Sequence, residues 1–342
     1  MAKNRDYWKK RFEQLEQAAN KEALTYLREL EKQYLKALQE IEAQINTWYR
    51  RFAVNNQIDM SEARRLLNTK ELAEFKWTVE DYIRFGEANE LNQLWMKQLE
   101  NASARFHISR LEALKVHIQQ SLETLFDKQL SGIDDLMKKI YMEDYYKTLF
   151  EVQKGFNVAW DIASVDQNKL SKIISKPWAV DGKNFSERIW TNKTKLISEL
   201  HNELTQMTIL GKGPDEAIRN IAQKMNTSKN NAGRLVMTEQ SYFSTVAQGD
   251  AFRELGVERY EIVATLDDRT SEICQELDGK VFEMKDFEAG VTAPPFHVWC
   301  RTVVAPYFDD DFGERAARGV DGEVYYVPGN ITYKQWKEKH VK

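Results

Sequence analysis

Residues 27–52 read LRELEKQYLKALQEIEAQINTWYRRF. Apolar side chains recur in this segment every three or four residues, at Leu27, Leu30, Tyr34, Leu38, Ile41, Ile45, Trp48 and Phe52. That period places them along one face of an α-helix with a nearly heptad repeat. Neither glycine nor proline occurs before Ile58, so we predict one long helix from about Asp6 to Phe52.

A helix of this length needs a partner along its apolar face. The pattern leaves two arrangements open, an antiparallel hairpin or bundle within one chain and a coiled coil between chains. Residues 71–85 and 91–126 also show helical spacing. Gly132 and Gly155 predict joints between the helical stretches that follow.

A change of pattern comes near residue 177. Pro177 and the Asp181-Gly182 pair predict a connecting turn. Residues 185–210 and 232–255 then return to helical spacing, the second stretch after the polar run 227–231. We therefore expect a second group of helices behind this turn.

The last ninety or so residues have a different character. β-Branched and aromatic residues predict short strands at 260–266, 280–282, 303–304 and 324–327, the second after an Asp278-Gly279 turn. The predicted fold is mainly α, with a long helical N-terminal part followed by a small α+β module. We predict three domains: a long-helix domain at 1–178, a helical middle segment at 179–255 and the α+β module at 256–342.

Composition and charge narrow the functional classes. No apolar run approaches the roughly 20 residues of a membrane span, and the first residues, Met1 to Asp6, lack the apolar stretch of a secretory signal. We expect no membrane partner. We also expect the chain to stay in the cytoplasm, where it is made. The net charge of −4 does not favour a free-standing, non-specific nucleic-acid binder, because such binding depends on Lys and Arg.

One cluster near the C-terminus could bind a metal. Cys274 precedes His297 by 23 residues, and His297 precedes Cys300 by three. Two thiolates and an imidazole can hold Zn²⁺ once a fourth ligand is present, and Asp267, Asp278 or water would complete the set. The alternative is a small fold held by apolar packing and buried reduced thiols, without metal. Asp267, Arg269 and Asp278 also fit as turn and salt-bridge residues better than as general acids or bases.

The same segments resemble a known family. They are Arg234-Leu235, Thr238-Glu239-Gln240, Asp267-Asp268-Arg269-Thr270, Leu277-Asp278-Gly279, Pro294-Pro295-x-His297 and Cys300-Arg301. Together they look like the C-terminal domain of the Mu F-like minor head proteins of tailed bacteriophages, over about residues 180–342. Many members carry a Cys-x-x-Cys pair after Asp-x-Arg-Thr, whereas this chain has Ser271 at the first position. That departure removes one zinc ligand that the resemblance implies.

The resemblance implies a minor capsid protein of the virion head, assembled in the bacterial cytoplasm. Such a protein acts in procapsid assembly and in DNA packaging or ejection at or near the portal vertex. Its expected partners are the portal, scaffolding and major capsid proteins, with phage DNA as a further candidate. Two other functions stay open, a DNA-binding internal head protein and a zinc-dependent nuclease. Residues 101–240 carry 20 Lys/Arg against 17 Asp/Glu, so we expect no concentrated basic surface for DNA. His297 has no second catalytic histidine, so we do not expect an enzyme.

Overall fold

The computed structural model describes residues 4–55, 110–156, 158, 162, 164–179, 181–210, 214–308, 314–318, 323–328, 331 and 333–340. The helices predicted at 71–85 and in the first part of 91–126 lie outside these residues. The described chain forms two compact units, each from separate stretches of sequence. We call residues 28–132 with 186–233 the bundle unit, and residues 1–27, 133–185 and 234–342 the mixed unit. The predicted domain boundaries at 178 and 255 stay a prediction.

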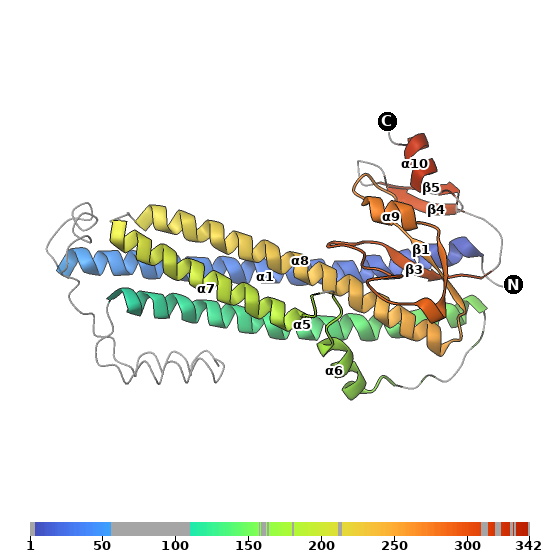
Figure 1. Cartoon of the computed structure of the whole chain (residues 1–342), viewed down its shortest axis with the longest axis horizontal. Helices are drawn as coiled ribbons and strands as arrows, with labels where there is room; N and C mark the ends of the chain where they lie inside the picture. The colour runs from blue at the N-terminus through green and yellow to red at the C-terminus, as the bar shows by residue number, and fades with distance from the viewer. Residues whose placement is uncertain are drawn as a thin grey trace. The chain divides into compact units, whose positions relative to one another are not determined.

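Four long helices supply the bundle unit: α1 (Arg5–Asn55), α5 (Arg110–Phe156), α7 (Phe185–Leu210) and α8 (Pro214–Glu254). Their segments run alongside one another in Figure 1. The predicted apolar face of α1 is the buried face, with Leu30, Ile41 and Ile45 at most 1% exposed. The prediction of a bundle within one chain is therefore confirmed, and α1 itself closely matches the predicted span from Asp6 to Phe52.

Tyr34 of α1 is buried in the bundle unit. Its hydroxyl is 3.3 Å from Gln129 Oε1 of α5 and 3.1 Å from Ser228 Oγ of α8. Asn192 of α7 donates to the same Ser228 hydroxyl at 2.9 Å. A buried polar group must be hydrogen-bonded to be tolerated, so this network fixes the register of four helices at one level.

Two predicted interruptions are wrong. Gly132 lies inside α5, and the polar run 227–231 lies inside α8. A helical glycine costs only about 1 kcal/mol, which the fully buried Ile133 beside it readily offsets. In α8, the hydrogen bonds of Ser228 and the burial of Ala232 stabilise the helix through its polar stretch.

The mixed unit holds the remaining elements. They are α6 (Gln167–Ser175), β1 (Arg259–Val263), α9 (Glu272–Leu277), β2 (Val281–Glu283), the 3₁₀ turn η1 (Met284–Asp286), β3 (Val303–Pro306), β4 (Glu314–Arg318), β5 (Val324–Pro328) and α10 (Tyr333–His340). β1 is the centre of a three-stranded antiparallel sheet in the order β2-β1-β3, and β4 pairs with β5. The small α+β module is thus confirmed, with β4 as a strand that the sequence did not predict.

The core of the mixed unit joins the start of α1 to the sheet. Trp8 and Phe12 pack in one cluster with Phe252 of α8 and with Tyr260 and Ile262 of β1. A buried ion pair reinforces this contact, because Lys9 Nζ lies 2.7 Å from Glu261 Oε1 and both side chains are at most 2% exposed. No helix in the described part of the chain is long and apolar enough to cross a membrane.

Candidate functional site

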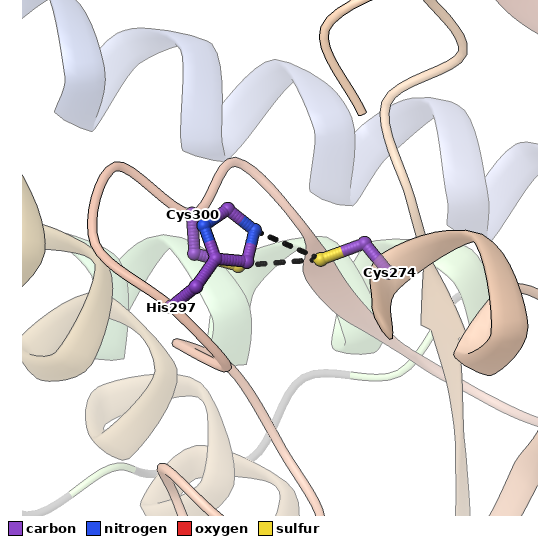
Figure 2. A group of neighbouring side chains, drawn as sticks. All are labelled: Cys274, His297 and Cys300. Atoms are coloured by element: carbon purple, nitrogen blue, oxygen red, sulfur yellow. Dashed lines mark hydrogen bonds between the residues drawn. The ribbon is translucent and has the colours of Figure 1, made fainter. Parts of the chain in front are cut away.

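The structure brings the two cysteines and His297 together. Figure 2 shows Cys274 Sγ within reach of both partners, 3.2 Å from His297 Nε2 and 3.8 Å from Cys300 Sγ. The three ligand atoms lie within 4.8 Å of one another. Within the described ranges, this is the one set of three or more His, Cys, Asp or Glu side chains arranged in this way.

Two short segments supply the cluster. Cys274 is the third residue of α9, and His297 and Cys300 belong to the loop that leads into β3. The amide N–H of Cys300 donates to the carbonyl of His297 at 3.2 Å, which closes a turn and keeps the two side chains on one side. Both thiols are buried against Ala264, with Phe296 packed beside them.

The orientation of His297 suits metal binding. Its Nδ1 lies 2.8 Å from the carbonyl oxygen of Val298. A carbonyl oxygen can only accept, so Nδ1 carries the proton and, in the neutral ring, Nε2 has the free electron pair. Metal-binding histidines commonly fix their ring through such a bond to a backbone carbonyl, and here Nε2 points at Cys274.

The two thiols of the cluster differ in acidity, and Cys300 is the more acidic. Its pKa is lowered well below the ordinary value, because its thiolate accepts a hydrogen bond from the Cys274 thiol and lies beside His297. The same hydrogen bond raises the pKa of Cys274, and contact with Cys300 raises the pKa of His297. Metal binding would release the protons that the two thiols carry.

Two of the three separations fit a tetrahedral zinc site. With Zn–S bonds of about 2.3 Å, two sulfurs at a tetrahedral angle lie about 3.8 Å apart, which is the separation of Cys274 and Cys300. With a Zn–N bond of about 2.0–2.1 Å, a sulfur and a nitrogen lie about 3.5 Å apart, close to the 3.2 Å between Cys274 and His297. The three residues could thus hold Zn²⁺ without large movement.

The two aspartates suggested as fourth ligands have other partners. Asp267 is 5% exposed and accepts hydrogen bonds from the Arg301 guanidinium, at 2.8 Å for Nη2, and from the amide of Arg269 at 3.0 Å. Burial alone would raise the pKa of Asp267, but the bonds from Arg301 hold it below the ordinary value. Asp267 therefore ties the start of the motif to the residue that follows Cys300.

Asp278 ties α9 to the sheet in the same manner. Its carboxylate accepts the amide of Ala264 at 2.9 Å, just beyond β1. Gly279 has a φ of 76°, a left-handed conformation that favours glycine, and its amide donates to Ile262 at 2.8 Å. Neither Asp278 nor Asp267 belongs to the set of mutually close ligand atoms.

One of the motif residues on α8 contacts the same loop. Thr238 accepts the amide of Trp299 at 3.4 Å, and Trp299 itself has a φ of 64°. Glu239 is 1% exposed and accepts the indole N–H of Trp178 at 2.9 Å. Thr238 of α8 thus contacts the segment that carries His297 and Cys300, whereas Glu239 contacts Trp178.

An open cavity of about 870 Å³ borders the cluster. Ser271, His297 and Cys300 line one side of it, and α1 lines another with Glu13, Glu16, Gln17, Asn20, Lys21 and Leu24. Burial raises the pKa of Glu16 to about 7. These α1 residues were not predicted as part of a site, because charged residues on an amphipathic helix carry no signal of a distant partner.

Comparison with known proteins agrees with these motifs. Residues 198–305 match the model of the family described as Phage Mu protein F like protein. This stretch of the chain is similar to the Mu F-like proteins. The resemblance to this family is therefore confirmed over residues that include the cysteine and histidine cluster, and outside them its predicted extent to 180–342 stays a prediction. No curated protein and no solved structure matches the chain.

Proposed function

We propose that the chain is a minor capsid protein that acts in head and procapsid assembly at or near the portal vertex. We also propose that it takes part in DNA packaging or ejection. Its similarity to the Mu F-like proteins indicates a structural role in phage head morphogenesis. That match supports the general role in the phage head. The location near the portal vertex and the link to DNA packaging or ejection go beyond it. The proposed location is the virion head.

The hydrogen bonds of the motif support a structural role over an enzymatic one. Asp267 and Asp278, the two aspartates considered above as further ligands, hold a guanidinium and a backbone amide. A general base must be able to reach a substrate proton, and a carboxylate engaged in this way is poorly placed for that. We propose a non-enzymatic protein, and we expect plasmid DNA to stay intact when it is incubated with the protein and Zn²⁺ or Mg²⁺.

A partly apolar rim offers a contact surface for another head protein. Leu24, Val298, Trp299 and Val324 all line the large cavity and are each at least 40% exposed. Exposed apolar patches mark sites of protein association, and tryptophan is a common anchor in such interfaces. We propose that the portal protein, or a scaffolding or major capsid protein, contacts this rim.

Co-purification tests this assignment. The tagged chain is expressed with the portal and scaffolding proteins of its phage, and we expect at least one of them to be retained in stoichiometric amount. Trp299→Ala should weaken that retention at least tenfold, whereas an exposed residue away from the rim, changed in Phe150→Ala, should leave it unaltered. Retention of neither protein by the wild-type chain would contradict the proposal.

We also propose one structural zinc ion at Cys274, His297 and Cys300. The supporting observations are the two near-tetrahedral separations from Cys274 and the orientation of Nε2. When bound, zinc would crosslink α9 to the loop before β3. Elemental analysis of protein purified without a chelator should give about one equivalent, and Cys300→Ser should reduce it severalfold. A content well below one equivalent in the wild-type protein would contradict the metal assignment.

A further inference from the structure

The cluster supplies three donors where a tetrahedral zinc site needs four. Among the described residues, no fourth Asp, Glu, His or Cys has a donor atom close to the other three. Asp267 and Asp278 are held elsewhere by Arg301 and Ala264. The fourth position therefore has to be filled from outside this set.

Ser271 marks where that position lies. It stands one helical turn before Cys274, at the N-cap of α9, and makes no capping hydrogen bond. Its side chain lines one small pocket together with Cys274 and His297. Ser271 thus adjoins two of the three donors.

Solvent and ligands can reach this point. Ser271, His297 and Cys300 all border the cavity of about 870 Å³, which is within the size range of ligand-binding sites. The far wall is polar, because Glu16, Asn20 and Lys21 of α1 line it. The open side of the cluster thus faces a space that admits a small molecule or a side chain.

We propose that this chain has an open zinc site, whose fourth coordination position beside Ser271 takes an external thiolate through the cavity. The inference rests on the zinc assignment made above. Two thiolates and a neutral imidazole balance the charge of Zn²⁺, so an anionic fourth donor is not repelled by excess negative charge. Sulfur matches the two sulfur donors already present. On binding, the thiol loses its proton to solvent and displaces the solvent molecule at that position, and no electrons are transferred.

Cobalt substitution provides the test, because the visible spectrum of Co²⁺ reports its ligands directly. The full chain is loaded with one equivalent of Co²⁺, kept reduced with a phosphine, and titrated with 2-mercaptoethanol. We expect a saturable increase in sulfur-to-cobalt charge-transfer absorption that corresponds to one added thiolate. Methanol, which lacks the sulfur donor, serves as the ligand control.

Ser271→Cys is the matched variant, since it places a thiol of the chain at the proposed position. This variant should show the thiol-saturated spectrum without any added ligand, should not respond to 2-mercaptoethanol, and should retain metal at least tenfold longer against a chelator. Ser271→Ala should keep the response to 2-mercaptoethanol.

Two results would overturn the inference, and they differ in what else they remove. Stoichiometric cobalt with no spectral response in the wild-type protein would show a closed site, and would leave the zinc assignment and the head function standing. Failure to bind cobalt or zinc at all would remove the metal site together with the inference. Neither result would affect a positive co-purification with head proteins.

Discussion

Asp267→Asn removes the charge that joins the start of the motif to Arg301. The native carboxylate accepts both guanidinium nitrogens of Arg301 as well as the amide of Arg269 and the hydroxyl of Thr270. Asparagine keeps the size and can still accept one or two of these bonds. The substitution therefore tests the charge pair more than the packing.

The expected cost follows from burial. The Asp267 side chain is 6% exposed and that of Arg301 is 26% exposed. Breaking a fully buried pair by neutralising one partner costs about 3–5 kcal/mol, and the partial access of water to Arg301 lowers this figure. We expect a loss of about 2–3 kcal/mol in the local opening free energy.

Hydrogen exchange followed by mass spectrometry measures this loss in peptides that cover 264–280 and 297–306. Such a change corresponds to exchange roughly 30 to 150 times faster. Arg269→Ala is the control at the same carboxylate, because the Arg269 pair is 3.7 Å long and its side chain is 77% exposed. Exposed pairs contribute less than about 1 kcal/mol, so the control should change exchange less than roughly fivefold. Equal effects of the two substitutions would refute the reasoning.

The Asp267–Arg301 pair also predicts the direction in which stability changes with pH. Since the pKa of folded Asp267 lies below its ordinary value of 3.8, its stabilisation is complete above that value and is lost as the pH falls through the folded pKa. Urea midpoints of wild type and Asp267→Asn should therefore differ at pH 6 and converge in strong acid. A constant difference at every pH would contradict this account.

Gly155→Ala should lower the unfolding free energy by about 1–2 kcal/mol despite the better helix propensity of alanine, because its Cβ would lie 2.1 Å from the buried Trp8 ring; a more stable variant in urea titration would contradict the close contact. Burial raises the pKa of Asp144 to about 7, against the lowering effect of Ser244, so its contribution to stability falls as the pH rises from about 4 to 7. Asp144→Asn should hence have the higher melting temperature at pH 8 and no advantage below pH 4, and a lower melting temperature at pH 8 would be the opposite result. Chelator should speed hydrogen exchange around Cys300 at least tenfold in wild type and leave Cys300→Ser unchanged; no effect on wild type would argue against bound zinc.

The spacing of apolar residues predicted the long helices. It did not predict that α5 continues through Gly132 or that α8 continues through the polar run 227–231. The face of α1 from Leu30 to Ile45 is visible in the sequence because local spacing and burial coincide there. Gly132 and the polar run before Ala232 looked like breaks, since local propensity favours ending a helix at such residues. Tertiary contacts such as those of Ser228 with Tyr34 and Asn192 outweigh that propensity, and no local pattern reveals them.

The three residues of the candidate site could also be predicted from local sequence. Cys274, His297 and Cys300 have rare side chains within one stretch of sequence, so their chemistry shows before the fold is known. Strand β4, with the sequence ERAAR, lacks the residues typical of strands and forms through pairing with β5 while it buries Ala317. The α1 wall of the cavity, including Glu16, lies more than two hundred residues away in sequence. Only the three-dimensional structure brings it to the cluster.

The central claim, a role in phage head assembly, is tested most directly on purified phage particles. Quantitative mass spectrometry of DNA-filled heads and of procapsids, from wild-type phage and from phage with a stop codon early in this reading frame, measures both presence and effect. We predict that the chain is found in wild-type heads at far fewer copies than the major capsid protein, and that its loss reduces the yield of infectious particles. Absence from both kinds of particle, together with a normal yield of infectious phage from the mutant, would contradict the claim.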